Sequence, residues 1–134
     1  MKPSLIIALL FLLSGACKKE SAAFLNKEIT LHPNTELTLG NHDAVKLKVV
    51  EINDSRCPEG VTCIWQGFAS VLIKAIYQDK DSIDIDLCLG ACTTVGKSSV
   101  QVIDIKGATY KVKLLAIEKD KGKNLKAIVM ISKL

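Results

Sequence analysis

The stretch Ser82–Leu87 reads Ser-Ile-Asp-Ile-Asp-Leu and alternates polar and apolar side chains without interruption. Successive side chains of a β-strand point to opposite faces, so Ile83, Ile85 and Leu87 share one face and the aspartates share the other. This two-residue period is typical of a strand with one buried face and one solvated face. The stretch therefore predicts a half-buried strand.

Similar stretches lie on both sides of it. The alternation in residues 44–52 changes face at Val49 and Val50, which predicts a β-bulge. Residues 127–131 are apolar on both faces, which predicts a strand that is covered on both sides. Strands are expected at 28–31, 35–39, 44–52, 67–78, 82–88, 99–106, 109–118 and 126–133.

Turn-forming residues separate the expected strands, at 40–41, 79–81, 106–107 and 121–124. No stretch combines a helical period with helix caps. Regularly spaced short strands of this kind are typical of sandwiches and barrels. The sequence predicts an all-β fold, an antiparallel sandwich or partly closed barrel of about eight strands.

The chain begins with a pattern of its own. Lys2 precedes an apolar run from Leu5 to Leu13, which is followed by three small residues at 14–16. The run is shorter than the roughly 20 residues that a membrane-crossing helix needs. A charge, an apolar run and small residues in this order predict an export signal.

The residues that close this segment, Leu13-Ser14-Gly15-Ala16-Cys17, resemble the lipobox of bacterial lipoproteins. The resemblance implies cleavage after Ala16 and a lipid anchor on Cys17. A plain secretory signal is the alternative, because the leucine lies one position earlier than in the commonest lipobox. Lys18 follows the cysteine, where aspartate signals retention in the inner membrane of two-membrane bacteria, so we expect the outer membrane.

These features divide the chain into a lipoprotein signal peptide at 1–16, a lipidated cysteine and tether at 17–26, and a single β domain at 27–134. Hydrophobic residues make up 49% and charged residues 24% of the chain, as in ordinary globular proteins. The formal charge of +4 falls to +3 when Lys2 is removed with the signal. So mild a charge argues against a nucleic-acid partner. We also expect the chain to be a monomer.

Four cysteines remain beside Cys17: Cys57, Cys63, Cys88 and Cys92. An even number in an exported domain predicts two disulfides, because the extracytoplasmic space is oxidising. Three pairings are possible. Pairing of neighbours, Cys57 with Cys63 and Cys88 with Cys92, is favoured because each pair brackets turn formers.

The densest unusual chemistry lies in residues 54–67, Asp-Ser-Arg-Cys-Pro-Glu-Gly-Val-Thr-Cys-Ile-Trp-Gln-Gly. Asp54 and Ser55 can start a turn, and Pro58 and Gly60 let the chain return to a bridge between its two cysteines. Trp65 follows Cys63 by two residues. In a strand the two side chains would share a face, so we expect Trp65 in the core near the disulfide, with a ligand-stacking role as the alternative.

This segment resembles a family of small bacterial secreted proteins and lipoproteins marked by Asp-Ser-Arg-Cys-Pro, a short variable loop and Cys-x-Trp-x-Gly. The resemblance is specific over 54–67 and weaker over about 28–78. It implies an exported β domain and no particular activity.

Two roles for the segment remain open. In the first, the disulfide, Arg56 and Trp65 fasten a long connection onto the sandwich. In the second, the segment is a rigid recognition loop, which loses little entropy on binding. The candidate recognition residues are Arg56, Pro58, Glu59, Gly60 and Trp65.

We find no catalytic residues, metal ligands or cofactor motif in the sequence. His32 and His42 lie far apart, and Asp79, Asp81, Asp84 and Asp86 lack the glycine and terminal glutamate of a calcium loop. We therefore predict that the chain is not an enzyme.

The expected function is a non-catalytic binding or structural role in the bacterial envelope, with an envelope protein or glycan as partner. A protease-inhibitor-like module that presents the loop between Cys57 and Cys63 is the first alternative, and a hydrolase or calcium-binding module is the second.

Overall fold

The computed structural model describes residues 25–39, 45–78 and 81–134. Strands dominate these ranges, which contain eight of them and one short 3-10 turn. The elements are β1 (Glu28–Leu31), β2 (Glu36–Leu39), β3 (Val45–Asp54), β4 (Phe68–Tyr77), β5 (Asp81–Gly90), η2 (Cys92–Val95), β6 (Val100–Ile105), β7 (Ala108–Lys119) and β8 (Leu125–Lys133). The strand predictions are confirmed, with ends displaced by no more than two residues.

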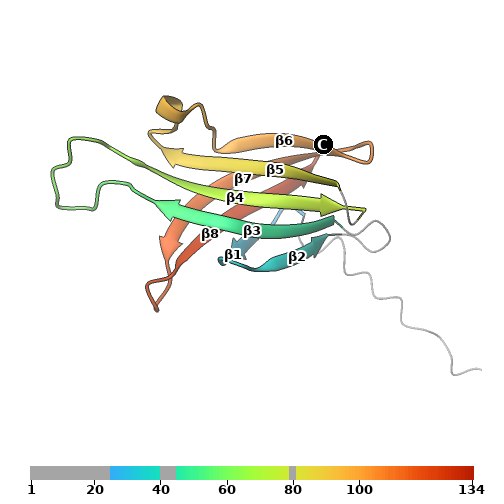
Figure 1. The fold of residues 1–134 in the computed structure, drawn as a ribbon, viewed down its shortest axis with the longest axis horizontal. Helices are drawn as coiled ribbons and strands as arrows, with labels where there is room; N and C mark the ends of the chain where they lie inside the picture. The colour runs from blue at the N-terminus through green and yellow to red at the C-terminus, as the bar shows by residue number, and fades with distance from the viewer. Residues whose placement is uncertain (1–24, 40–44, 79–80) are drawn as a thin grey trace, which may run out of the picture.

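The strands of the described ranges form two antiparallel sheets that pack against each other (Figure 1). One sheet has the order β1-β8-β7-β6 and the other the order β2-β3-β4-β5. Each sheet keeps its own edge strands. Of the two expected architectures, the structure therefore has the sandwich.

Apolar side chains from the inner faces of both sheets fill the space between them. In β5, Ile85 and Leu87 are fully buried, whereas Asp84 on the other face is exposed. The same alternation buries Val112 and Leu114 of β7. Each buried side chain of this size contributes about 1.5–3 kcal/mol relative to an exposed one. The predicted alternation is therefore what holds the two layers together.

Two bulges interrupt the ladders. The pairing of β3 with β4 shifts between Val49 and Glu51, which confirms the predicted bulge and leaves Val50 exposed. A second shift, between Leu114 and Ala116 of β7, was not predicted. The expectation that β8 is covered on both faces holds only in part, because Val129 and its inner neighbours are buried while Ile128 and Met130 are half-buried.

Local backbone chemistry explains the two predicted turns that the structure describes. Lys106 and Gly107 both have positive φ, as a two-residue hairpin between β6 and β7 requires. In the turn between β7 and β8, the Asp120 carboxylate accepts hydrogen bonds from the backbone N–H groups of Gly122 and Asn124. The turn predicted at 40–41, and residues 79–80 of the next, lie outside the described residues.

The open edge of β5 is covered by Gln101 of the opposite sheet and by Ser98, which precedes β6. Gln101 of β6 accepts a hydrogen bond from the Asp86 N–H at 3.0 Å and donates one to the Asp84 carbonyl at 3.0 Å. The Cys88 N–H donates to the Ser98 carbonyl at 2.9 Å. An unpaired edge invites pairing with a foreign strand. These contacts occupy the edge and so hinder such pairing.

The sandwich has two different ends. The described chain begins at Leu25, which bridges to Ile131 near the end of β8. At the other end, the β3–β4 connection (residues 55–67) and the β7–β8 turn (residues 120–124) project from the sheets (Figure 1). We call the second end the loop pole and the first the terminal pole.

The predicted signal peptide (1–16), Cys17 and most of the tether (17–26) lie outside the described residues. Within the described ranges, no helix is both long enough and apolar enough to span a membrane.

Candidate functional site

The β3–β4 connection starts from a pair of charged side chains. The Arg56 guanidinium donates from Nε to Asp54 Oδ1 and from Nη2 to Asp54 Oδ2, both at 2.9 Å. Its Nη2 also donates to the Ile117 carbonyl of β7 at 2.7 Å. Asp54 ends a strand of one sheet and Ile117 belongs to the other. Arg56 therefore fastens the root of the connection to the opposite sheet.

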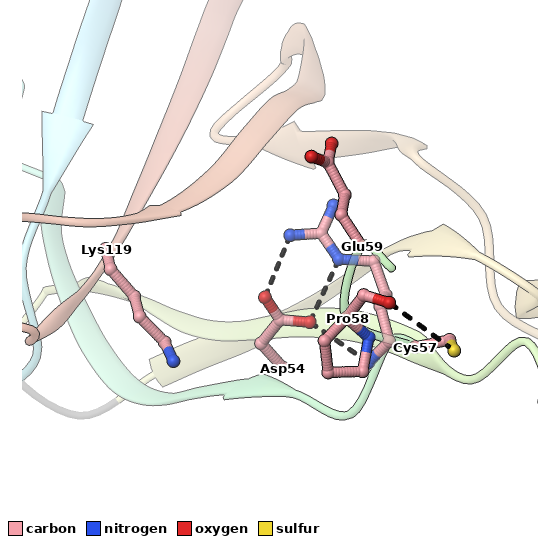
Figure 2. A pocket seen from close by; sticks show the side chains of 6 residues that line it. Asp54, Cys57, Pro58, Glu59 and Lys119 are labelled. Atoms are coloured by element: carbon pink, nitrogen blue, oxygen red, sulfur yellow. Dashed lines mark hydrogen bonds and ion pairs between the residues drawn. The ribbon is translucent and has the colours of Figure 1, made fainter. Parts of the chain in front are cut away.

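This geometry changes the acidity of both groups. The pKa of Asp54 lies below its usual value, chiefly because the Arg56 side chain donates hydrogen bonds to the carboxylate. The same contact raises the pKa of Arg56. Lys119, at the end of β7, extends toward Asp54 from the other side (Figure 2), and its positive charge adds to the lowering of the Asp54 pKa. Both groups of the pair are therefore charged at neutral pH.

Backbone contacts close the root of the connection. The Ser55 N–H and the Ser55 hydroxyl both donate to the Phe68 carbonyl, at 2.9 and 2.8 Å. The Cys57 N–H donates to the Gln66 carbonyl at 3.1 Å. Gly67 has a φ of +68°, and a Cβ built there would lie 2.0 Å from the Ser55 carbonyl oxygen. Only glycine fits at this position.

Both favoured disulfides are present. Cys57 is bonded to Cys63 with a Cα–Cα distance of 5.9 Å, and Gly60, with a φ of +78°, supplies the turn between them. Cys88 is bonded to Cys92 with a Cα–Cα distance of 5.8 Å, which holds η2 against β5. The predicted pairing is therefore confirmed.

The outer part of the connection exposes three large apolar side chains. Ile64 is 95% exposed, Trp65 81% and Val61 58%. The prediction that Trp65 lies in the core is wrong. Alternate residues share a face only within a strand, and the chain from Cys63 to Trp65 bends before β4 begins at Phe68. Trp65 therefore points into solvent, and we call Val61, Ile64 and Trp65 the apolar tip.

The candidate recognition residues divide among the root, the turn between the two cysteines and the apolar tip. Arg56 is committed to the root through Asp54 and Ile117, whereas Pro58, Glu59 and Gly60 are exposed in the turn. The contacts that fasten the segment and the side chains that are exposed to solvent thus lie in different parts of it. Sequence reasoning missed Val61 and Ile64, although their position between turn formers and beside a tryptophan was a usable signal.

A shallow hollow lies at the root of the connection. Figure 2 shows its lining residues, which are Asp54, Arg56, Cys57, Pro58, Glu59 and Lys119. Four of these side chains carry charge, and Asp54 and Arg56 already neutralise each other. The hollow is therefore a polar surface beside the apolar tip.

Two of the other acidic residues singled out in the sequence, Asp84 and Asp86, are surface ion-pair partners. Asp84 lies 3.6 Å from Lys74 and Asp86 lies 2.9 Å from Lys97. In the part of the chain that the structure describes, no three His, Cys, Asp or Glu side chains are placed to hold a metal ion. His42 and Asp79 lie outside that part.

The fold and this site define a two-sheet antiparallel sandwich that carries a disulfide-braced, apolar-tipped loop. Comparison of the chain with protein-family models, with curated proteins and with solved structures found no significant match. The resemblance of residues 54–67 to the family of small secreted proteins and lipoproteins therefore stays a prediction.

Replacement of Gly67 by alanine tests the close approach at the root. We expect Gly67→Ala to lower the free energy of unfolding by more than about 4 kcal/mol, because the new Cβ meets the Ser55 carbonyl in a left-handed backbone conformation. Gly60→Ala is the matched control. Its Cβ would meet nothing within 4 Å, so it should cost only about 1–2 kcal/mol. Urea unfolding measures the free energy of unfolding of both variants. Equal losses of stability would contradict the close approach of position 67 to the Ser55 carbonyl.

Replacement of Asp54 by asparagine tests the charged pair. The folded-state pKa of Asp54 is depressed, so its contribution to stability is fully present above the unfolded-state pKa of about 3.9 and is lost as pH falls through the folded pKa. We expect Asp54→Asn to cost about 1 kcal/mol at pH 7, a partly screened value, and the difference from the unmodified chain to vanish in acid. Glu59→Gln, in the same loop, should show neither effect in unfolding measured across pH.

Proposed function

We propose that the chain is the precursor of an extracytoplasmic bacterial lipoprotein, anchored through Cys17, whose β-sandwich has a non-catalytic binding role. The loop of residues 55–67 is its recognition element. The observation that carries this proposal is the apolar tip. Burial of a side chain such as Ile64 or Trp65 is worth about 1.5–3 kcal/mol, yet the fold leaves both in solvent.

The construction of the loop supports binding. The disulfide, the Arg56 contacts and the backbone bonds to Phe68 and Gln66 hold the root before any partner arrives. A loop ordered in advance loses little conformational entropy on association. Tryptophan is also enriched among the few residues that dominate binding energies. The root thus stiffens the segment and the tip supplies the contact.

The oxidised cysteines support the proposed compartment. Two disulfides in so small a domain suit an oxidising extracytoplasmic space and would be unusual in the cytosol. Together with the export pattern at 1–16 and the lipobox-like residues before Cys17, they support a site in the bacterial envelope. Lys18 favours the outer membrane.

A protease-inhibitor-like module is the second candidate, since a disulfide-bridged, exposed loop is a form that a protease cleft can receive. Incubation of the protein with a panel of proteases separates the two candidates. Inhibition that is lost on replacement of a tip residue would favour the inhibitor, whereas no inhibition across the panel would leave the first proposal.

The anchor is tested by Cys17→Ser. We expect the unmodified chain in the membrane fraction of the cells, because each buried methylene of the attached lipid contributes about 0.8 kcal/mol. The variant should move to the soluble extracytoplasmic fraction, and Lys18→Ala should leave the chain in the membrane. A Cys17→Ser chain that still sediments with membranes would contradict lipid anchoring.

The recognition element is tested by Trp65→Ala in the full chain. We expect the variant to keep the unfolding free energy within about 0.5 kcal/mol, as for surface residues elsewhere, while capture of envelope proteins by the chain falls at least about tenfold. Val102→Ser is the matched control, since Val102 is an exposed apolar residue of β6 at 54% exposure. Equal capture by both variants would remove the loop from the proposal.

A further inference from the structure

Two features that are distant in the sequence project from the loop pole. One is the apolar tip of the β3–β4 connection, and the other is the β7–β8 turn. The Arg56 contact to the Ile117 carbonyl and the hollow that Asp54 shares with Lys119 join the bases of the two. Figure 1 shows both projecting from the same end of the sandwich. They can therefore meet one partner together.

The β7–β8 turn brings positive charge to this pole. Lys119, Lys121 and Lys123 are exposed. The carboxylate of Asp120, which lies among them, is occupied by backbone N–H groups of the turn. Charged residues around an apolar centre form the usual rim of a protein interface. The turn therefore suits a partner surface that carries carboxylates.

The position of the pole bears on which partner can reach it. The chain enters the sandwich at the terminal pole, where the Asn26 N–H donates to the Ile131 carbonyl. From Leu125 to Ile131, β8 alone rises about 20 Å, and the β3–β4 connection that carries the apolar tip projects from the end of the sandwich at which that strand starts. If Cys17 holds the membrane, the pole nearest to the anchor along the chain is the terminal pole and not the pole that carries the tip. The anchoring membrane is thus disfavoured as the occupant.

The shape and chemistry of the tip further limit which kinds of partner it can bind. A convex apolar tip needs a concave apolar pocket, and the hollow beside it is lined by charged side chains, so a second copy would find no match there. A glycan would use Trp65 for stacking but would leave the aliphatic Val61 and Ile64 without a suitable contact. A pocket in another protein suits all three side chains.

We propose that the loop pole docks a second, different protein: the apolar tip enters an apolar pocket, and Lys119, Lys121 and Lys123 face acidic residues at the rim of that pocket. This inference rests on the proposed binding role and deepens it. The partner is a protein with an apolar pocket and an acidic rim, and it meets the pole opposite the entry of the chain into the sandwich. The tip supplies the buried centre, and the lysines set orientation and the rate of association.

Photo-crosslinking in intact cells tests the proposal. A photoreactive phenylalanine analogue is placed at position 64 of the full chain, and at position 102 as a control. We expect a covalent adduct with another protein from position 64 only. The adduct yield should fall at least about tenfold with Trp65→Ala. An adduct with lipid, an adduct with a second copy of the chain, or no adduct at position 64 would overturn the inference.

The basic rim is tested separately. Lys121→Glu combined with Lys123→Glu should lower the adduct yield from position 64 about threefold or more, with a larger effect at low ionic strength. Lys111→Glu combined with Lys113→Glu reverses two exposed charges of β7 outside the β7–β8 turn and should leave the yield unchanged. Equal effects of the two pairs would contradict an acidic rim.

These readouts are independent of the anchor. A Cys17→Ser chain that stays with membranes would defeat the lipoprotein proposal while leaving a protein adduct at position 64 intact. A lipid adduct at position 64, with normal release of Cys17→Ser, would defeat the docking inference alone.

Discussion

Burial of the two inner sheet faces is the constraint on which the other features depend. Each four-stranded sheet presents alternate apolar side chains on one side, among them Ile85 and Leu87 from one sheet and Val112 and Leu114 from the other. Neither sheet could shield these faces alone, so the two pack together. Because strands of different sheets must then end close to one another, Asp54 of β3 and Ile117 of β7 come within reach of a single arginine.

Arg56 links these two strands and thereby supports the loop. Its guanidinium is planar and carries several donors in fixed directions, so it can hold the Asp54 carboxylate with two nitrogens and still reach a carbonyl of the other sheet. A lysine could not make the same set of bonds. The glycine at position 67 then allows the two arms of the connection to approach closely. These contacts explain structurally why the segment combines an acid, an arginine and a glycine around its cysteines.

The exposed apolar tip is a disadvantage in solution, and nothing else in the fold explains why it is exposed. An exposed tryptophan and isoleucine on a projecting loop add a site for non-specific association. The β5 edge, by contrast, is covered by Gln101 and Ser98, as expected for a chain that avoids unwanted pairing. The β5 edge is thus covered while the apolar tip is exposed to solvent, and this difference supports the proposal that the tip binds a partner.

The sequence by itself determined the strands, the all-β class and the bulge at Val49, and it favoured the pairing of the two disulfides, because alternation, turn formers and short cysteine spacings act over a few residues. The choice between a sandwich and a partly closed barrel was made by the packing of the two sheets. It could not place Trp65, since that position depends on where β4 begins and on how Arg56 and Gly67 set the root of the loop. Nor could the sequence predict the bulge in β7 or the coverage of the β5 edge by Gln101. Each arises from contacts between segments far apart in the chain, and only the tertiary structure brings those segments together.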